Sequence, residues 1–406
     1  MCSERPLPGP SIGSMAEMEM PELQIPGPFA EWVRSVASGE RSIPNAEGER
    51  HHYTPQFVLK KFQGPARKLF QLDKRDGSCV EVKPKDAAWA PNLYAVETDD
   101  GQHDGIIEGF ISVAENFAAP SLGRLLNAPA SFTDEDRGNL AFLLAIQEQR
   151  APGWLVEFEE RIAQAGTMWA TVELANRPGA KGMKRRAREA AAALTSGAVT
   201  IKPTRGNVLG MTLMGLSATV GPAYGLPWTL YRAREGAFIT SDRPLTMHDP
   251  NPPHKFSGAA WMSSDFATVT MPLSSKACLR TCPSDPHRFA ERYTSRQVER
   301  INLRTYGWAT RYVYGRSAEL LEDLHARAVT DPGAVPAPTK KRHVILEDLS
   351  TADPAVAERN RARGWDPYLS IREEDGSHRV VSYEVIDSDE DARRVVSPRA
   401  PRGQPS

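Results

Sequence analysis

Apolar residues recur at intervals of three and four along much of the chain, and this spacing predicts helices that each bury one face. The longest such stretch is 104–126, and its expected buried stripe consists of Ile106, Phe110, Val113 and Phe117. The next helix is expected to open with Thr133 as its N-cap and to stop before Pro152. Further helices are predicted at residues 29–40, 154–166, 180–195, 206–219, 295–307 and 317–328.

Alternation of apolar and polar residues predicts strands between these helices. Hairpins are expected where two alternating runs flank an Asp-Gly or Glu-Gly pair, as they do in residues 67–84, 228–245 and 368–385. Residues 265–282 and 309–315 add further strands. Together the patterns predict an α+β fold, with a mixed or largely antiparallel sheet packed against several helices.

Changes in composition predict how the chain is divided. The first residues are rich in Pro, Gly and Met without periodicity, and the segment after the last long helix is rich in Pro. We expect a disordered N-terminal extension, a main α+β domain, a Pro-rich linker, a small β-rich appendage and a disordered tail. Their respective bounds are 1–27, 28–328, 329–340, 341–387 and 388–406.

Bulk composition narrows the compartment and the class of partner. The 406 residues are 40% hydrophobic and 25% charged, and the net charge of −1 requires neither a nucleic acid nor a membrane as partner. The four cysteines form no Cys-x-x-Cys pair and no zinc-like spacing, which favours free thiols in a reducing compartment. No apolar run is long enough for a transmembrane helix or a secretion signal, so we expect a cytoplasmic protein without a membrane partner.

The segment HHYTPQFVLKKF, residues 51–62, combines a helix start with two histidines. Thr54 is expected as the N-cap and Pro55 as the first helical residue. His52 lies just upstream of that start, where the free N–H groups of a helix favour anions. It is therefore a candidate acid/base or metal ligand, and the alternative is a histidine that only donates a structural hydrogen bond. His51 is the weaker candidate, because neighbouring side chains usually point apart.

Acidic and amide side chains on two predicted helices are the next candidates. Glu108 and Glu115 are seven residues apart and share a helix face. That face is either solvated or, because Ile107 and Ile111 widen the apolar arc toward it, part of a cleft.

On the following helix, Gln147 and Arg150 continue an apolar face, where a buried polar group needs a partner. That partner is either a group inside the fold or a bound anion, for which the guanidinium fork is suited. Asp242 ends a predicted strand immediately before Arg243. It is expected either to make a local turn bond or to present a catalytic or metal-binding carboxylate, with Arg243 as a secondary candidate.

Several motifs together resemble a bacterial family known as domain of unknown function 4238. His52, Tyr53, Pro55, Phe57, Leu59 and Phe62 match its opening pattern of His-Tyr-x-Pro, an aromatic residue, Leu and Phe. The resemblance continues through GIIEGFISVAENF, FLLAIQEQR, FITSDRP, MPLSSKACL and INLRTYGWATRYVYG, and it covers roughly residues 50–318. It implies a common fold unit and brings no activity with it.

Two functions remain open from the sequence. The first is a metal-assisted hydrolase of phosphate esters, such as a nuclease, acting on nucleic acid or a phosphorylated small molecule. In that case His52, Asp242, Glu108 and Glu115 would be catalytic, and the three acids would hold Mg²⁺ or Mn²⁺. The phosphate-binding residues would be Gln147, Arg150, His51 and Arg243.

The second function is a non-enzymatic binding protein that uses the same polar residues structurally. No phosphate-binding Gly-rich loop is present, so no nucleotide cofactor is expected. If the protein is a hydrolase, we expect His52 to lie beside Arg150 or Gln147 and beside at least one of the three acids. The sequence leaves the oligomeric state open.

Overall fold

The computed structural model describes the chain in segments, and these fall into two compact units. The described residues are 25–46, 48–97, 102–176, 181–195, 198–248, 268–283, 288–335, 343–348, 354–362, 368–372 and 378–386. The first unit comprises Met1–Phe158, Thr204–Pro252 and Ser257–Pro338, and the second comprises Glu159–Pro203, Pro253–Phe256 and Thr339–Ser406. Most of the predicted N-terminal extension, residues 336–340 of the linker and the whole C-terminal tail lie outside the described residues.

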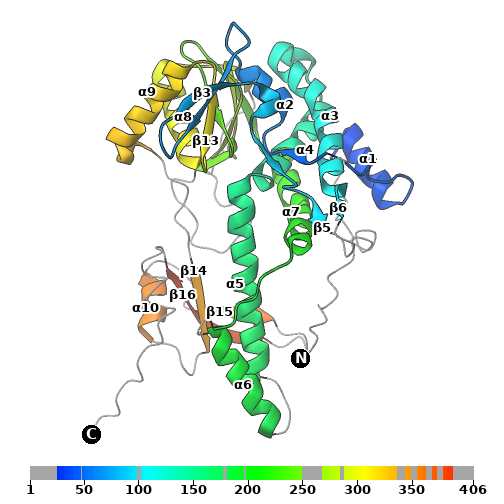
Figure 1. The fold of residues 1–406 in the computed structure, drawn as a ribbon, viewed down its shortest axis with the longest axis vertical. Coiled ribbons are helices and arrows are strands. Elements are labelled where there is room, and N and C mark those ends of the chain that lie inside the picture. Colours follow the sequence, from blue (N-terminus) through cyan, green and yellow to red (C-terminus); the bar gives the residue numbers. More distant parts are fainter. Residues whose placement is uncertain are drawn as a thin grey trace. The chain divides into compact units, whose positions relative to one another are not determined.

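Helices of the first unit cover two sheets. Figure 1 shows α8 and α9 beside β3 and β13, whereas α1, α3, α4 and α7 gather on the other side of this unit. The bounds are α1 Pro28–Ala37, α2 Gln56–Leu59, α3 Ile106–Asn127, α4 Asp134–Gln149, α7 Arg205–Gly225, α8 Ser295–Trp308 and α9 Ala318–Thr330. Helix α5, Pro152–Asn176, begins in this unit. No helix among the described residues is long and apolar enough to cross a membrane.

The larger sheet of the first unit is mixed, and the smaller one is antiparallel. The larger has the order β12-β7-β11-β10-β9, and only β12 and β7 are parallel. Its bounds are β12 Arg288–Tyr293, β7 Trp228–Ala233, β11 Ala277–Thr281, β10 Thr268–Ser274 and β9 Thr246–His248. The smaller has the order β3-β2-β13-β8, with bounds Cys79–Val82, Leu69–Asp73, Tyr312–Gly315 and Thr240–Ser241. The fold is therefore α+β, as predicted.

Two short antiparallel pairs complete the first unit. Strand β1, Arg50–His52, pairs with β4, Trp89–Pro91, and β5, Val96–Glu97, pairs with β6, His103–Asp104. The described part of the chain also contains the 3-10 turns η2 Lys60–Phe62, η3 Pro84–Asp86, η4 Pro129–Ser131 and η6 Pro332–Ala334.

The predicted hairpin of residues 228–245 is wrong. A turn with Gly236 at φ 74° does follow β7, but β7 pairs with β11 and β12 while β8 pairs with β13 in the smaller sheet. The buried side chain of Asn302, on α8, diverts the chain between them. Its Oδ1 accepts from the Ile239 N–H at 3.1 Å, and its Nδ2 donates to the Ala237 carbonyl at 2.9 Å.

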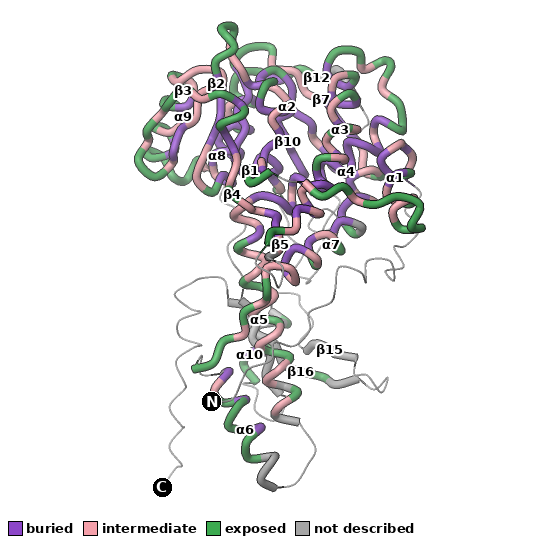
Figure 2. The backbone as a smooth tube through the Cα atoms, turned by 45° about the vertical axis from the view of Figure 1, so that its right-hand side comes forward, coloured by how far each residue is buried: buried purple, intermediate pink, exposed green. Residues whose placement is uncertain are grey.

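The predicted stripe of α3 is only partly buried. Ile106, Phe110, Val113 and Phe117 are all of intermediate exposure. The fully buried face is rotated from that stripe and consists of Ile107, Gly109, Ile111, Ala114, Ala118, Ser121, Leu122, Leu125 and Leu126. Figure 2 shows that α4 beside it is buried along most of its length. Helix α3 is thus covered on more than one side, and this brings its glutamates to the edge of the core.

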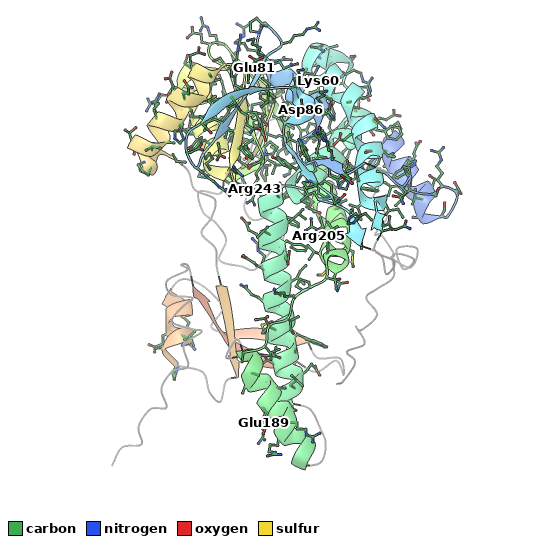
Figure 3. All side chains as sticks on the ribbon, viewed as in Figure 1. Lys60, Glu81, Asp86, Glu189, Arg205 and Arg243 are labelled. Carbon is green, nitrogen blue, oxygen red and sulfur yellow. The ribbon has the colours of Figure 1, made fainter. Side chains whose placement is uncertain are left out.

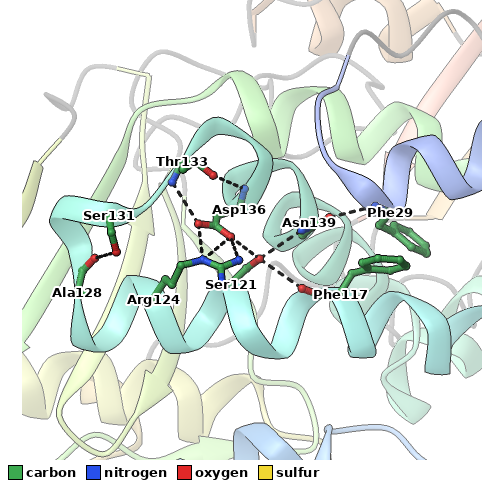
Figure 4. A network of polar contacts seen from close by, with 9 residues as sticks. All are labelled: Phe29, Phe117, Ser121, Arg124, Ala128, Ser131, Thr133, Asp136 and Asn139. Atoms are coloured by element: carbon green, nitrogen blue, oxygen red, sulfur yellow. Dashed lines mark hydrogen bonds and ion pairs between the residues drawn. The ribbon is translucent and has the colours of Figure 1, made fainter.

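Polar contacts join α3 to α4 at one end (Figure 4). The Asp136 carboxylate accepts from the Ser121 hydroxyl at 2.8 Å and from Arg124 Nε at 2.8 Å. Thr133 and Asp136 form the capping box that begins α4, which confirms the predicted N-cap. Asn139 then accepts from the Phe29 N–H at 3.2 Å and so ties α1 to the pair.

Gly105, the N-cap of α3, and Gly109 allow a loop to pass close to the first turns of the helix. A Cβ added at Gly109 would lie 1.7 Å from the Pro44 carbonyl oxygen, and one at Gly105 would lie 2.0 Å from that of Ala46. Any larger residue there would force the backbone of the loop away. The loop therefore covers the first turns of α3, where Glu108 is located.

The second unit has its own small antiparallel sheet. Its strands have the order β14-β16-β15, with bounds His343–Asp348, His378–Ile386 and Tyr368–Arg372. The pairing of β15 with β16 confirms the predicted last hairpin. Helix α10, Pro354–Ala362, packs against β16, and the unit also contains α6, Lys181–Thr195.

Candidate functional site

The two histidines of the opening motif have different environments because they are neighbours on strand β1. The His51 side chain is buried and both of its ring nitrogens are used. Nδ1 accepts from the Tyr94 backbone N–H at 2.9 Å, so Nε2 carries the proton and donates to the Gly48 carbonyl at 2.9 Å. Burial lowers the pKa of His51, which keeps this tautomer neutral. His51 therefore fixes the backbone on both sides of the site.

His52 is half-buried and has one ring nitrogen free among the described residues. Its Nε2 donates to the Lys85 carbonyl at 3.2 Å, and no group of the described residues bonds to Nδ1. Burial lowers its pKa below the usual 6.5, and the charges of Glu115 and Arg150 also act on the ring. At pH 7 the imidazole is thus neutral, with Nδ1 available as a base.

The helix start after His52 differs from the prediction. Helix α2 has Pro55 as its N-cap, without a side-chain capping bond, and it is only four residues long. The Thr54 hydroxyl instead donates to the Ser241 carbonyl at 3.1 Å. The segment is therefore held by the smaller sheet, and so short a helix adds little positive potential for an anion.

A buried chain of polar groups runs from α4 to α3. Gln147 Nε2 donates to the Tyr53 carbonyl at 2.7 Å, and Gln147 Oε1 accepts from Arg150 Nη2 at 2.8 Å and Nε at 3.1 Å. The remaining Arg150 nitrogen, Nη1, lies 2.6 Å from Glu115 Oε1. The Arg150 side chain is 2% exposed and that of Glu115 is 23% exposed. The ion pair therefore has one buried end and one end facing outward.

Glu108 lies about two helical turns before Glu115. Its carboxyl group has no ion-pair partner among the described residues. Its Oε2 is buried and makes no hydrogen bond to any described residue. Burial raises the pKa of Glu108 to about 8; the charge of Arg150 opposes the rise and that of Glu115 adds to it. At pH 7 this carboxyl is mostly protonated. A proton-bearing carboxyl without a protein partner beside an ion pair is typical of acid/base sites.

Tyr94 joins these groups and was not found from the sequence. Its hydroxyl donates to the Arg150 carbonyl at 2.7 Å, and its ring stacks on His51 at a centroid distance of 5.7 Å. The residue lies in the turn after β4, where no periodicity marks a tyrosine as buried. Only the pairing of β1 with β4 brings it to the site.

A small cavity of about 20 Å³ adjoins Tyr94 and Arg150, between α3, α4 and α7. Such a volume holds about one water molecule. The carbonyl oxygen of the buried Gln149 amide has no partner among the described residues, and this residue also lines the cavity. The other lining residues are Ile107, Ile111, Ile146, Leu155, Leu209, Thr212, Leu213 and Leu216.

Asp242 is held by the backbone of a neighbouring loop. Its Oδ1 accepts from the Thr310 N–H at 2.8 Å, and its Oδ2 accepts from the Arg311 and Tyr312 N–H groups at 2.7 and 2.9 Å. Burial raises its pKa, and the three N–H groups oppose the rise. With both oxygens occupied, the carboxylate fixes the loop that enters β13.

Arg243 also has partners inside the fold. Its Nη1 lies 3.0 Å from Glu157 Oε1 on α5, and its guanidinium lies 4.9 Å from the centre of the Trp308 ring. Figure 3 labels Arg243 near the first turns of α5. Neither Asp242 nor Arg243 makes a hydrogen bond to His52, Glu108, Glu115 or Arg150.

Comparison with known protein families gives one match for the chain. The family model described as a protein of unknown function, DUF4238, matches residues 50–319. The chain belongs to the DUF4238 family. The match covers every candidate side chain of the site, from the histidine motif to Asp242 and the loop that it holds. Neither the curated proteins nor the solved structures that were compared with the chain gave a match.

The DUF4238 domain thus gathers one cluster, which we call the His52 cluster. It consists of His52, Glu108, Glu115, Gln147 and Arg150, with Tyr94 and His51 behind them. Asp242 and Arg243 lie outside it. Among the described residues, no three His, Cys, Asp or Glu side chains are grouped as metal ligands. Glu108 and Glu115 lie in the His52 cluster and Asp242 lies outside it, and their role as a joint set of metal ligands stays a prediction.

Proposed function

We propose that this DUF4238 protein is a hydrolase in which Glu108 and His52 exchange protons with a bound substrate. The observation that supports this most is the Glu108 carboxyl, whose buried Oε2 has no protein partner. A buried polar atom without a partner costs stability, so a fold that keeps one calls for a function of that atom. Here the atom lies beside the Glu115–Arg150 ion pair.

The Glu108 carboxyl and the His52 imidazole have complementary protonation states at neutral pH. Burial raises the pKa of Glu108 to about 8, so the carboxyl carries a proton at pH 7. Burial lowers the pKa of His52, so its imidazole lacks the second proton. An acid that already carries its proton and a base that already lacks one can act in the same reaction without first exchanging protons with solvent.

Hydrolysis of a phosphate ester would use both groups in one step. His52 Nδ1 removes a proton from a water molecule as the water oxygen bonds to phosphorus. The bond between phosphorus and the leaving oxygen breaks, and Glu108 gives its proton to that oxygen. The products are a phosphate and an alcohol, and the proton on His52 returns to Glu108 through solvent.

The Glu115–Arg150–Gln147 chain positions the reacting groups. Arg150 is fixed at Nη1 by Glu115 and at Nε and Nη2 by Gln147, so its charge stays where it acts on both Glu108 and His52. Gln147 in turn holds the Tyr53 carbonyl, next in sequence to His52. Fixed charges of this kind cost no reorganisation during the reaction.

Cations near His52 favour a phosphate ester as the substrate. An open depression of the surface is lined by Lys60, Gln63, Gly64, Arg67 and Pro84. Pro84 immediately precedes Lys85, whose carbonyl oxygen holds the His52 ring. Lys60 and Arg67 are exposed and pair with no carboxylate among the described residues, so a phosphate bound there would meet uncompensated positive charge.

A direct assay tests the proposal. Hydrolysis of bis(p-nitrophenyl) phosphate, single-stranded DNA and RNA is measured with EDTA, with Mg²⁺ and with Mn²⁺. Glu108→Gln and His52→Ala should each lower kcat by about 10²-fold or more, whereas the exposed Glu81→Gln should not. The wild-type rate should fall above about pH 8, where Glu108 loses its proton. Full activity in both variants, or no turnover of any substrate by the wild type, would reject the proposal.

A second function, binding without catalysis, is supported by the bonds that the predicted phosphate-binding residues already make inside the fold. His51, Gln147, Arg150 and Arg243 all bond to groups inside the fold. We infer that a protein without catalytic activity would use the His52 cluster to bind a ligand that bonds to Glu108 and to His52 Nδ1. Binding of a nucleotide or phosphate in isothermal titration, abolished by Glu108→Gln without any turnover, would select this function.

A further inference from the structure

Exposed cations surround the depression beside His52, and we call them the basic rim: Lys60, Arg67, Lys83 and Lys85. Lys60 and Arg67 line the depression, and Lys83 and Lys85 flank Pro84, which also lines it. None of the four cations forms an ion pair with any described residue. The chain as a whole carries a net charge of −1, so the positive charge of the basic rim is a local feature.

Two acids of the same segments are already paired with other cations. Glu81 Oε2 lies 2.7 Å from Lys68 Nζ, and Asp86 Oδ1 lies 3.3 Å from Arg50 Nη1. Figure 3 labels Glu81 and Asp86 in the same part of the first unit as Lys60. The charge of the basic rim therefore stays available to an anionic ligand.

A strained turn places Arg67 at the depression. Its φ of 57° is left-handed, a conformation that strains any residue with a side chain and that glycine adopts freely. The Gly64 N–H donates to the Lys68 carbonyl at 2.8 Å, and the Arg67 N–H donates to the Gly64 carbonyl at 2.9 Å. A charged side chain kept in such a turn at the wall of a depression indicates a function for that charge.

Arg50 and Trp89, which we call the stacking pair, offer a planar surface near the basic rim. The Arg50 guanidinium lies 4.5 Å from the centre of the Trp89 ring, and the Arg50 side chain is 58% exposed. Trp89 Nε1 donates to the Asp86 carbonyl at 3.2 Å, which joins the ring to η3. Trp89 lies opposite His52 in the pairing of β1 with β4, and Arg50 lies two residues before His52. The stacking pair and His52 therefore share one face of this strand pair.

The basic rim and the stacking pair suit different parts of one ligand. Separate cations along a surface contact successive backbone phosphates, whereas a guanidinium plane over an aromatic ring accepts an unstacked base. The depression has a volume of about 610 Å³, many times the roughly 30 Å³ of one water molecule, so it has room for more than a phosphate ion. In a duplex the bases stack on one another, so a single strand fits both features together.

We propose that the basic rim and the stacking pair bind single-stranded nucleic acid, with its backbone against the rim and a base on Arg50. Single strands of DNA and of RNA share this chemistry. Binding uses β1, η3, β4 and the turn at Arg67, and it requires no turnover. That the bound strand is also the substrate cut beside His52 rests on the proposed function.

Fluorescence anisotropy of the full chain in EDTA measures binding apart from hydrolysis. The probes are short labelled strands of DNA and of RNA and a duplex of the same sequence. A single strand should bind about tenfold more tightly than the duplex. Its affinity should fall with salt, with a slope of log K against log [KCl] of about −0.7 for each phosphate contacted. Tighter binding of RNA than of DNA would identify RNA as the ligand, and the reverse would identify DNA.

Arg67→Gly removes a charge of the basic rim and relieves the strained turn. The variant should melt within about 3 °C of the wild type, and its Kd for the single strand should rise about tenfold, with a shallower salt slope. Lys60→Met should weaken binding in the same way. Arg41→Met, on the exposed loop after α1, is the matched control and should bind as the wild type does.

Trp89→Leu tests the stacking pair without changing the charge. Its Kd for the single strand should rise about tenfold with an unchanged salt slope, and Trp89→Phe should restore most of the affinity. Inorganic polyphosphate, which has no bases, should compete equally well in the wild type and in Trp89→Leu.

No saturable binding of a single strand, equal affinity for the duplex, or wild-type affinity in both Arg67→Gly and Lys60→Met would overturn the inference. An unchanged Kd in Trp89→Leu would overturn it as well, because binding by charge alone is not specific to nucleic acid. Strand binding without turnover of any phosphate ester would support this inference and reject only the hydrolase. Turnover of bis(p-nitrophenyl) phosphate without strand binding would support the hydrolase and overturn this inference.

Discussion

Arg150 Nη1 lies 2.6 Å from Glu115 Oε1, and this bond joins the end of α4 to the middle of α3. The guanidinium is buried whereas the carboxylate is partly exposed, so the pair brings a fixed charge to the edge of the core. Glu108 and His52 both respond to these two charges. The ion pair is therefore the part of the His52 cluster on which the other polar groups depend.

Arg150→Ala should lower the free energy of unfolding by about 3 kcal/mol, because it leaves Gln147 and Glu115 without their partner. Urea unfolding at pH 7 measures the change. Arg185→Ala is the matched control, since Arg185 forms an ion pair with Glu189 in which the two side chains are 77% and 63% exposed. The control should change stability by less than about 0.5 kcal/mol. A loss for Arg150→Ala as small as that of the control would contradict the buried role of the pair.

Substitution of the two adjacent histidines should destabilise the protein to different extents. His51→Ala leaves the Tyr94 N–H and the Gly48 carbonyl unsatisfied, which should cost about 2 kcal/mol or more of stability. His52→Ala removes one hydrogen bond from a half-buried ring and should cost less than about 1 kcal/mol. Melting temperatures of the two variants give the comparison directly. Equal destabilisation would show that the two rings have the same structural role.

Glu108 makes stability depend on pH. Its folded pKa of about 8 lies above the ordinary 4.5, so the folded protein binds more protons than the unfolded chain between these values. Its favourable contribution is complete below pH 4.5 and is lost as pH rises through about 8, by up to ~1.4 kcal/mol for each pH unit crossed.

Glu108→Gln removes this titration. Between pH 5 and pH 8 the variant should therefore gain stability relative to the wild type, as chemical unfolding at both pH values would show. Glu81→Gln changes an exposed carboxylate and serves as the control. A constant difference between Glu108→Gln and the wild type from pH 5 to pH 8 would argue against the raised pKa.

Asp242→Asn should destabilise the loop that leads into β13. An amide can offer only its oxygen to the three backbone N–H groups at Thr310, Arg311 and Tyr312, and its NH₂ group then faces a donor. The expected cost is about 2–4 kcal/mol, with faster amide exchange at these residues. Activity of the folded fraction should persist, because Asp242 lies outside the His52 cluster. Wild-type stability with loss of activity would restore Asp242 as a catalytic candidate.

Local patterns were sufficient to predict most elements. The helix from Thr133, with its capping box, follows directly from neighbouring residues. The hairpin of β2 and β3, with Gly77 at φ 73°, follows from the Asp76-Gly77 pair in the same way. The hairpin at 228–245 failed because Asn302, more than sixty residues later, redirects the chain by two backbone bonds. Such long-range bonds leave no trace in a local pattern.

The sequence predicted some of the contacts in the His52 cluster and missed others. Arg150 and Gln147 were expected to need buried partners, and the structure supplies them from Glu115 and the Tyr53 carbonyl. Burial of Glu108 depended on which neighbours cover α3, and its own sequence allowed either a solvated face or a cleft. Tyr94 gave no signal at all, because its contacts come from the pairing of two short strands.

The two hydrogen bonds of Asn302 have a consequence for how the first unit opens. Ala237 and Ile239 lie in the link between β7 and β8, and Asn302 fixes this link to α8, so any separation of the two sheets that moves the link away from α8 breaks both bonds. Both sheets should therefore open as one cooperative block, with their amide protons exchanging together and not sheet by sheet. A single amide side chain on α8 in this way joins two layers into one thermodynamic unit.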